Sequence, residues 1–386
     1  MPNVIGVLQT GATHVLPVVT SASLPQVEAF ARALKAAGSS ASLSEPVRVL
    51  PYDLADCLGT LRQTMTAMRS AKPEVNWTGG TKVMSYAARR LAEELTLPAL
   101  YVNTTERQVL IEDLSTGPVR TEMIDSARLG LNVLVHIVAA GHSVEGAASV
   151  EAFRRRCLPA PALVKAATLI MDARSTERGD LLKLAGAVTN ACTPTRLNDD
   201  FLRTFVEAQL IRPGRRSGEF LLSTETLLHP FHRQSPQEQN AAFLKGLYLE
   251  VFLWSQIQER SGLDDVAWHV VLNPGERGRM AELDVVVASE GRLLVLECKS
   301  HIDLEELADV IEEQYARTRR IGRLLGRWML YVHRHRADYP AANAAAIIAS
   351  QEAKAKDYGG RLLWQDDLDD LPIAVATFLN EPKPLL

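Results

Sequence analysis

The stretch that decides the fold is Ala281-Glu282-Leu283-Asp284-Val285-Val286-Val287, then Ser289-Glu290-Gly291, then Arg292-Leu293-Leu294-Val295-Leu296-Glu297-Cys298-Lys299. Both apolar runs have the alternating or continuous apolar character of buried strands. The dipeptide between them has the composition of a two-residue hairpin turn, because glycine tolerates the positive φ that such turns require. The sequence therefore predicts an antiparallel hairpin centred on Glu290-Gly291.

The polar residues of this hairpin predict an enzyme. With a two-residue turn, Asp284 lies across from Glu297 and Glu282 lies across from Lys299. Since side chains alternate along a strand, we expect all four to point from the same face. Three acids and a lysine are costly to bury on an apolar hairpin unless they hold a metal and a reacting group.

A further acid is expected from the preceding helix, which is predicted from about Glu238 to Arg260. At about 100° per residue, Glu250 falls within the apolar stripe of this helix, whose nearest members are Phe243, Leu247, Trp254 and Ile257. A glutamate in that position needs a partner. One hypothesis is a salt bridge to a core arginine; the other is that it faces Asp284 and Glu297 and completes an acidic metal site.

The acids and the lysine match metal-dependent phosphodiester hydrolysis. Carboxylate oxygens suit Mg²⁺ or Mn²⁺, which keep positions open for water and a phosphate. Such a metal lowers the pKa of bound water and neutralises charge on the phosphorus. Lys299 would orient the attacking water or stabilise a phosphorane-like transition state.

Three segments carry a resemblance to a known family: Gly246-Leu247-Tyr248-Leu249-Glu250, Glu282-Leu283-Asp284 and Glu297-Cys298-Lys299. They resemble the restriction-endonuclease-like PD-(D/E)xK nucleases, most closely the branch found in CRISPR ancillary effectors. The chain departs from the written pattern because Leu283, not proline, precedes the aspartate.

The resemblance implies a role for each matching residue. Asp284, Glu297 and the backbone carbonyl of Cys298 would hold the metal, and Glu250 would support it. Lys299 would be catalytic. Gln314, on the helix that follows, is similar to the glutamine often found after the Glu-x-Lys strand in this family.

Length and composition limit the alternatives. A chain of 386 residues predicts two domains. We see no signal peptide and no apolar run of about 18 residues, so we expect no membrane span. The four cysteines form no CxxC pair, which fits a reducing cytoplasm. A net charge of −4 argues against coating nucleic acid by bulk charge, but not against a local basic patch.

The first 150 residues alternate strand and helix signals. Expected strands cover 4–8, 47–50, 75–78, 99–102 and 108–111, and expected helices cover 23–38, 53–70 and 82–95. The first strand would end in Gln9-Thr10-Gly11. Such alternation predicts a largely parallel sheet covered by helices, with ligands at the carboxyl ends of its strands.

Thr78-Gly79-Gly80-Thr81-Lys82 stands where one of these strands becomes a helix. Glycines let backbone N–H groups approach a phosphate, and a helix N-terminus favours negative charge. The segment is neither GxxxxGK[ST] nor GxGxxG, so an ATPase or a dinucleotide dehydrogenase is poorly supported. From the residues alone, an anion or nucleotide pocket and an ordinary tight turn both remain open.

The wider string Asn76-Trp77-Thr78-Gly79-Gly80-Thr81-Lys82-Val83-Met84 is similar to a motif of CARF domains. These are Rossmann-like sensors of cyclic oligoadenylates in type III CRISPR immunity. The resemblance implies a ligand site formed by Thr78, Gly79, Gly80, Thr81 and Lys82, with Gln9, Thr10 and Gly11 at its other edge. It also implies a homodimer around a symmetric ring, most simply cyclic tetra-adenylate.

The predicted fold class is therefore α/β. Residues 1–150 form a Rossmann-like CARF domain, 151–234 a helical connector or degenerate winged helix, and 235–386 a restriction-endonuclease-like domain. The predicted function is a nuclease that cuts DNA, RNA or both with Mn²⁺ or Mg²⁺ once a cyclic oligoadenylate binds. Two alternatives remain: a CARF-type transcription regulator with an inert C-terminal domain, and a constitutive restriction or repair nuclease.

An arginine-rich stretch follows the hairpin and has two interpretations. It could contact phosphates of a substrate, or it could be a solvated helix face balanced by Glu305, Glu306, Glu312 and Glu313. Its members are Arg317, Arg319, Arg320, Arg323, Arg327, Arg334 and Arg336.

Overall fold

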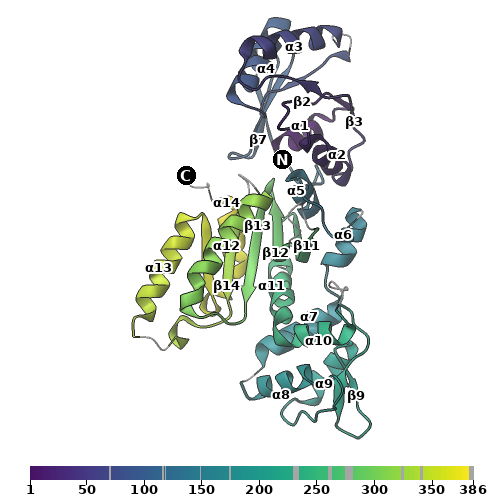
Figure 1. The fold of residues 1–386 in the computed structure, drawn as a ribbon, viewed down its shortest axis with the longest axis vertical. Coiled ribbons are helices and arrows are strands. Elements are labelled where there is room, and N and C mark those ends of the chain that lie inside the picture. The colour runs from purple at the N-terminus through teal and green to yellow at the C-terminus, as the bar shows by residue number, and fades with distance from the viewer. Residues whose placement is uncertain are drawn as a thin grey trace.

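The computed structural model describes residues 1–68, 71–114, 117, 119–147, 149–173, 175–228, 234–259, 263–273, 281–322, 326–339 and 342–381. The chain is arranged in three parts (Figure 1). The N-terminal elements lie at one end, a five-stranded sheet with its helices lies in the middle, and the helices of the connector lie at the other end. The α/β class is confirmed.

The central sheet has the strand order β11-β12-β13-β14-β15. Its strands are β11 (Asp265–Leu272), β12 (Ala281–Ser289), β13 (Arg292–Lys299), β14 (Gly326–Val332) and β15 (Gly360–Trp364). The first three strands pair antiparallel, and β13, β14 and β15 pair parallel.

The predicted hairpin is confirmed. Ser289 pairs with Arg292, so the turn consists of Glu290 and Gly291. Both have positive φ, at 49° and 79°, as the favoured two-residue hairpin turn requires. This turn fixes the register, and the register decides which side chains the two strands bring together.

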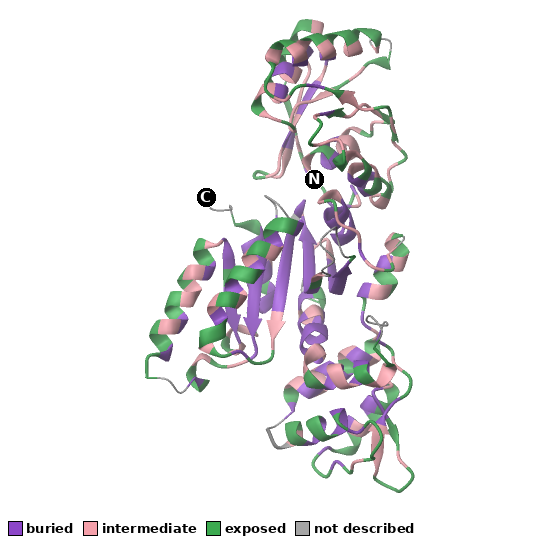
Figure 2. Cartoon of the chain, viewed as in Figure 1, coloured by how far each residue is buried: buried purple, intermediate pink, exposed green. Residues whose placement is uncertain are grey.

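Helices cover both faces of this sheet, which explains why its strands are almost entirely buried (Figure 2). On one face, α11 (Tyr248–Glu259) and α14 (Leu371–Asn380) share a core with Val285, Leu296 and Met329. The other face is covered by α5, α12 and α13, whose bounds are Val133–Ala139, Leu304–Gly322 and Ala344–Asp357.

The first predicted strand is wrong, because residues 4–8 lie in the helix α1 (Pro2–Thr10). A short apolar run fits a buried helix as well as a strand, so end signals decide. Pro2 stands at the first helical turn, and Gly11 adopts a left-handed φ of 65° at the C-cap. Gln9, Thr10 and Gly11 therefore end a helix.

The other N-terminal elements follow the prediction more closely. The helices are α2 (Gln26–Ala36), α3 (Leu54–Ala67) and α4 (Lys82–Leu95); the predicted last residues of α3, at 69–70, lie outside the described residues. The strands are β1 (His14–Val15), β2 (Val18–Val19), β3 (Ser42–Leu43), β4 (Val47–Arg48), β5 (Val75–Asn76), β6 (Ala99–Asn103), β7 (Gln108–Glu112) and β8 (Val119–Met123).

These strands do not form the largely parallel sheet that was expected. In the four-stranded sheet β5-β6-β7-β8, only β5 and β6 pair parallel, while β1-β3 and β2-β4 are separate parallel pairs. The links β6–β7 (residues 104–107) and β7–β8 (residues 113–118) are short. Short links allow antiparallel pairing but not a parallel crossover, which explains the difference.

The connector has the predicted helices and a small ribbon. Its elements are α6 (Val150–Cys157), α7 (Pro161–Asp172), α8 (Ser175–Ala185), α9 (Asp199–Glu207) and the antiparallel pair β9 (Ile211–Pro213) and β10 (Phe220–Leu222). Helix α7 packs with α11 in one core. The degenerate winged helix stays a prediction.

The chain leaves the N-terminal part along the edge of the central sheet. Val144 forms an antiparallel bridge with Leu272 of β11. Glu145 N donates to Val271 O and Asn273 N donates to Ser143 O, both at 2.9 Å. The segment 143–145 thus adds to the edge of the central sheet, directly after α5 has packed on the face of that sheet. None of the described helices is long and apolar enough to cross a bilayer.

The buried imidazole of His136 gives a prediction for α5. Burial, and to a smaller extent the N-terminal amine, lower the pKa of His136 to about 3, and its Nε2 has no hydrogen-bond partner among the described residues. The folded state therefore resists protonation of the His136 imidazole. The free energy of unfolding keeps its full value above about pH 6.5 and falls as the pH decreases below it. His136→Phe should flatten this acid loss by up to about 1.4 kcal/mol per pH unit.

Urea unfolding between about pH 7 and pH 5 measures this effect. The exposed His14, changed to Gln, is the control, and it should keep the pH dependence of the wild type. An equal acid dependence in His136→Phe and the wild type would contradict the prediction.

Candidate active site

The predicted polar residues meet where β12 and β13 separate. The β12–β13 pairing ends at Val285↔Leu296, one residue short of Asp284 and Glu297. Beyond that point the Asp284 carboxylate replaces a backbone acceptor, because Cys298 N donates to Asp284 Oδ2 at 2.7 Å. The carboxylate therefore stands between the strands at the edge of a buried sheet.

The expectation that all four polar side chains point from one face of the hairpin is wrong for β12, because this strand rotates at Asp284. Glu297 and Lys299 do share a face, since Lys299 Nζ donates to Glu297 Oε1 at 2.7 Å. On β12, however, Val285 packs in the core beneath α11, whereas Leu283 packs in the core beneath α5. Neighbours two apart would share a face in a regular strand, so β12 rotates at Asp284.

Strand β11 rotates at the same level. Trp268 packs in the α11 core and Val270 in the α5 core. His269 between them has a φ of 47°, a left-handed value that a residue other than glycine seldom adopts. The pairing between β11 and β12 skips His269 and resumes at Val270↔Leu283. His269 is thus directed out of the ladder and toward the acids.

Glu250 reaches the cluster from α11. The predicted single helix is α10 (Pro236–Ala242), a π-helical segment Phe243–Leu247, and then α11. The π turn changes the rotation per residue, so the helical-wheel relation of Glu250 to Phe243 does not hold. Even so, Glu250 is only 8% exposed, and its Oε2 lies 3.5 Å from Nδ1 of His269. Among the described residues, Glu250 contacts this histidine and forms no ion pair with an arginine.

Burial and mutual repulsion perturb the acids strongly. Burial raises the pKa of Glu250 well above its usual value, and the charges of Glu282 and Glu297 raise it further. Burial likewise raises the pKa of Asp284 well above its usual value, helped by Glu250 and Glu297. Carboxyl groups in this state hold protons unless a cation takes the place of the protons, which is the behaviour expected of a metal site.

Two cations hold Glu297. Lys299 contacts its Oε1, and Arg317 Nη1 donates to its Oε2 at 2.9 Å. Burial acts to lower the pKa of Lys299, but Glu297 and Asp284 outweigh it and the pKa is raised, so the ammonium stays charged. Arg317 also bonds Glu313 and the carbonyl of Glu282, which ties α12 to the start of β12.

The remaining predicted residues are present but differ in environment. Burial raises the pKa of the Cys298 thiol well above its usual value, so the sulfur is no thiolate ligand and only the backbone of this residue suits a hard cation. Gln314 is 1% exposed on α12, and its Oε1 has no hydrogen-bond partner among the described residues. Thr318, one turn later, has an equally unpartnered Oγ1.

Sequence reasoning missed His269 as a member of the site. Burial lowers the pKa of His269 to about 4, so its imidazole is neutral and able to accept a proton or a metal. Its Nδ1 lies 3.0 Å from Glu282 Oε1. The available signal was a histidine in the middle of an apolar strand, which alone does not distinguish a ligand from a core residue.

The arginine-rich stretch serves mainly internal contacts. Arg327 is buried and donates to the carbonyls of Phe378 and Glu381. Arg336 pairs with Glu352, Asp366 and Asp367. Arg323 lies outside the described residues. The substrate-phosphate hypothesis therefore does not hold for Arg327 and Arg336.

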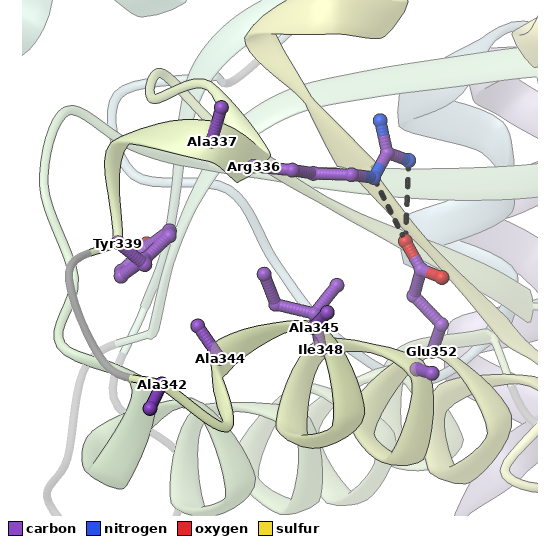
Figure 3. Close-up of a pocket in the computed structure, with 9 residues that line it drawn as sticks. Arg336, Ala337, Tyr339, Ala342, Ala344, Ala345, Ile348 and Glu352 are labelled. Atoms are coloured by element: carbon purple, nitrogen blue, oxygen red, sulfur yellow. Dashed lines mark hydrogen bonds and ion pairs between the residues drawn. The ribbon is translucent and has the colours of Figure 1, made fainter.

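A cavity of about 510 Å³ beside α13 is separate from the acid cluster. Figure 3 shows the Arg336–Glu352 ion pair across from Tyr339, with alanines and Ile348 of α13 between them. None of the clustered acids Glu250, Glu282, Asp284 and Glu297 lines this cavity, so it is not part of the predicted site.

The second predicted site, at the start of α4, is built by local contacts. Thr81 caps the helix by accepting from Met84 N at 3.2 Å, and its hydroxyl donates to Pro51 O. Thr78 Oγ1 accepts from Val102 N at 2.8 Å. Lys82 is exposed and Gly80 has a φ of 91°. These contacts explain a tight turn and leave the ammonium of Lys82 at the surface.

The neighbour of this turn is not the one predicted. A Cβ on Gly79 would stand 2.7 Å from Asn3 Nδ2, so the start of α1, not its end, approaches the turn. Gln9, at the other end of α1, donates to Glu122 of β8 at 2.5 Å. Gln9, Thr10 and Gly11 thus end a helix and not a strand, and their part in a ligand site stays a prediction.

Comparison with known proteins shows which family the segment around the acid cluster resembles. Residues 237–372 match the family described as Card1-like, endonuclease domain. This segment, called the Card1-like domain below, is similar to that family. It contains Glu250, His269, Asp284, Glu297 and Lys299. No curated protein matches the chain.

The whole chain shares its fold with solved structures. One is Can2 from Sulfobacillus thermosulfidooxidans in complex with cyclic tetra-adenylate, at 18% identity, a TM-score of 0.63 and coverage of 98% of this chain and 94% of that one. Another is protein VC1899 from Vibrio cholerae, at 15% identity, a TM-score of 0.68 and coverage of 99% and 96%.

A third is a type III CRISPR defence DNA nuclease activated by cyclic oligoadenylate. Its identity is 17% and its TM-score 0.53, and the match covers 86% of this chain but 43% of that one. At these identities the likeness establishes the arrangement of an N-terminal α/β part joined to the Card1-like domain. It does not by itself assign a ligand.

The buried charge of Glu250 gives a prediction for the Card1-like domain. The folded state raises the pKa of Glu250 well above its usual value of 4.5. The free energy of unfolding therefore decreases as the pH rises above 4.5, because the folded state resists ionisation of this carboxyl. Glutamine does not titrate and avoids this loss. Without metal, Glu250→Gln should therefore have a higher Tm than the wild type, and the gap should widen from about pH 5 to pH 8.

Differential scanning calorimetry in a chelator measures the gap. Glu259→Gln, at the end of the same helix and exposed, is the matched control. A gap that stays constant with pH would contradict the buried-charge explanation.

Proposed function

We propose that the protein is a metal-dependent nuclease that a cyclic oligoadenylate activates. The observation that carries this proposal is the group of buried carboxylates, with one charged lysine beside it, at the open end of a hairpin in the Card1-like domain. Such a group is destabilising without a cation and has the donor types that Mg²⁺ and Mn²⁺ bind.

The residues fit a divalent cation. Asp284, Glu297 and the backbone carbonyl of Cys298 would hold it, and Glu250 would support it from α11. The raised pKa values of Asp284 and Glu250 support the assignment, because a bound cation offsets the charge that burial disfavours. When bound, the metal supplies an activated water and neutralises charge on the phosphate.

Lys299 is the group that acts on the reacting atoms. It lies at the end of β13, partly exposed, where a phosphate can approach. Its ammonium would orient the attacking water or stabilise charge on the phosphorane-like transition state. Arg317 holds the far oxygen of Glu297 and thereby keeps the carboxylate and Lys299 in one orientation. Gln314 is buried on α12, the helix of Arg317, and would support Glu297 and Lys299 from that side.

The N-terminal part would be a CARF sensor. The turn Thr78 to Lys82 stands at a helix N-terminus, which suits a phosphate, and a solved structure of this fold binds cyclic tetra-adenylate. Asn3, next to Gly79, joins this predicted site, while Gln9, Thr10 and Gly11 would contribute only at its margin. We propose a homodimer in which two such turns face one cyclic tetra-adenylate.

Activation would require the ring to bind the competent state of the nuclease more tightly than the idle state. A contiguous core contains residues of α1, α2 and α5 together with Val286 and Val295 of the central sheet. A movement of these helices would therefore be transmitted to the sheet that carries Asp284 and Glu297. The proposed substrates are DNA, RNA or both, in type III CRISPR antiviral defence.

Cleavage assays test the proposal. The protein is incubated with Mn²⁺ and single-stranded RNA, single-stranded DNA or supercoiled plasmid, with and without cyclic tri-, tetra- and hexa-adenylate. Glu297→Ala and Lys299→Ala should each reduce ring-dependent cleavage by about 10²-fold or more. Lys245→Ala, an exposed lysine on the neighbouring π segment, controls for the general loss of a surface cation.

Each negative outcome has a separate meaning. No cleavage under any condition would leave a ligand-responsive regulator in place of a nuclease. Cleavage that ignores every ring would indicate a constitutive nuclease. Full activity in Lys299→Ala would show that the active site lies elsewhere.

The sensor turn gives its own prediction. Lys82 is exposed, and the structure places no ion-pair partner beside it among the described residues. Lys82→Ala should therefore leave the Tm unchanged and weaken the binding of cyclic tetra-adenylate by roughly 10-fold, the loss of one charged phosphate contact. Isothermal titration calorimetry measures it. Lys35→Ala is the control, and equal affinities of Lys82→Ala and wild type would contradict this placement of the ring.

A further inference from the structure

Beside the predicted acids lies a second group of potential metal ligands. Nδ1 of His269 and one carboxylate oxygen each from Glu250 and Glu282 all lie within 4.8 Å of one another. They come from three different elements, β11, α11 and β12. The family resemblance assigns no role to His269 or to Glu282, so this group is separate from the set Asp284, Glu297 and Cys298.

The distances suit direct coordination. Nδ1 of His269 is 3.0 Å from Glu282 Oε1 and 3.5 Å from Glu250 Oε2. With metal–ligand bonds of about 2.0–2.2 Å, neighbouring ligands of one ion stand roughly 2.8–3.6 Å apart. Nδ1 of His269 therefore already has this spacing from both carboxylates, and the two carboxylate oxygens lie within 4.8 Å of each other.

An independent observation points to a ligand here. Glu250 Oε2 is buried and has no hydrogen-bond partner among the described residues, although its residue is only 8% exposed. A buried carboxylate oxygen without a donor carries a large desolvation penalty. A cation between Glu250, His269 and Glu282 would satisfy that oxygen, and Glu282, half-exposed, leaves the group open to solvent on one side.

We propose that Glu250, His269 and Glu282 form a second cation subsite, which binds Mn²⁺ and discriminates against Mg²⁺. The discrimination follows from the imidazole, because nitrogen donors suit transition-metal ions whereas Mg²⁺ takes oxygen ligands almost exclusively. Glu250 is common to both ligand sets. The subsite lies next to the proposed nuclease centre, so its role in cleavage rests on the proposed function, but its existence does not.

Metal binding tests the subsite without any cleavage assay. Metal-stripped, full-length protein is titrated with Mn²⁺, and free Mn²⁺ is measured by electron paramagnetic resonance. The wild type should bind two ions per chain. Excess Mg²⁺ should displace the ion at the oxygen-only site and leave the other, and pulsed spectra of the remaining ion should show coupling to an imidazole ¹⁴N.

The variants are chosen to preserve the fold. Asn tolerates a positive φ, so His269→Asn keeps the backbone at 47° with little strain. Glu282→Gln is isosteric and its side chain is half-exposed. Each should remove the nitrogen-coupled ion or weaken it by about 10-fold or more, while the second ion stays. Asp284→Asn should instead remove or weaken the ion at the oxygen-only site and keep the nitrogen-coupled ion.

His333→Asn is the matched control, because it removes an imidazole of similar burial from the neighbouring end of the sheet. It should retain both ions and the ¹⁴N coupling. A single ion per chain in the wild type, no ¹⁴N coupling, or an unchanged nitrogen-coupled ion in both His269→Asn and Glu282→Gln would each overturn the subsite. Ring-activated cleavage with only one bound ion would keep the nuclease proposal and reject this one.

Discussion

The burial of three carboxylates, Glu250, Asp284 and Glu297, close to one another is the constraint on which the C-terminal half depends. Glu250 and Asp284 have strongly raised pKa values because water is excluded and because their neighbours carry the same charge. The local structure accommodates this in identifiable ways. Lys299 and Arg317 hold Glu297, and Cys298 N donates to Asp284. These contacts leave Glu250 Oε2 without a hydrogen-bond partner among the described residues.

The geometry of the corner comes from irregular backbone. A π segment precedes Glu250, His269 adopts a left-handed φ, and β12 stops pairing with β13 beside Asp284. Regular strands and helices would bury these polar groups against apolar neighbours or send them to solvent. Departures of this kind concentrate at functional sites because they are stable only where the surrounding packing fixes them. Here both faces of the sheet are packed by helices, which supplies that support.

The N-terminal part and the central sheet are joined by side-chain packing and by backbone pairing. Helix α5 is buried between the N-terminal helices and the central sheet, and the following segment 143–145 pairs with β11 close to His269. A sensor connected only by a flexible linker could not bias a distant site. A shared core can, because packed elements move between discrete arrangements and do not deform continuously.

The sequence by itself determined the hairpin, since Glu290-Gly291 admits one turn type and the turn fixes the register of Asp284 and Glu297. It also determined that Glu250 lies on the apolar side of its helix and that a helix begins after Thr81. Residues 4–8 were misassigned because a short apolar run fits either a strand or a helix. Only the tertiary structure decided that Asn3 meets Gly79, that Arg327 is buried while Arg336 pairs with acids, and that His269 joins the acid cluster. Those contacts join residues far apart in the chain, and neither periodicity nor spacing along the sequence encodes them.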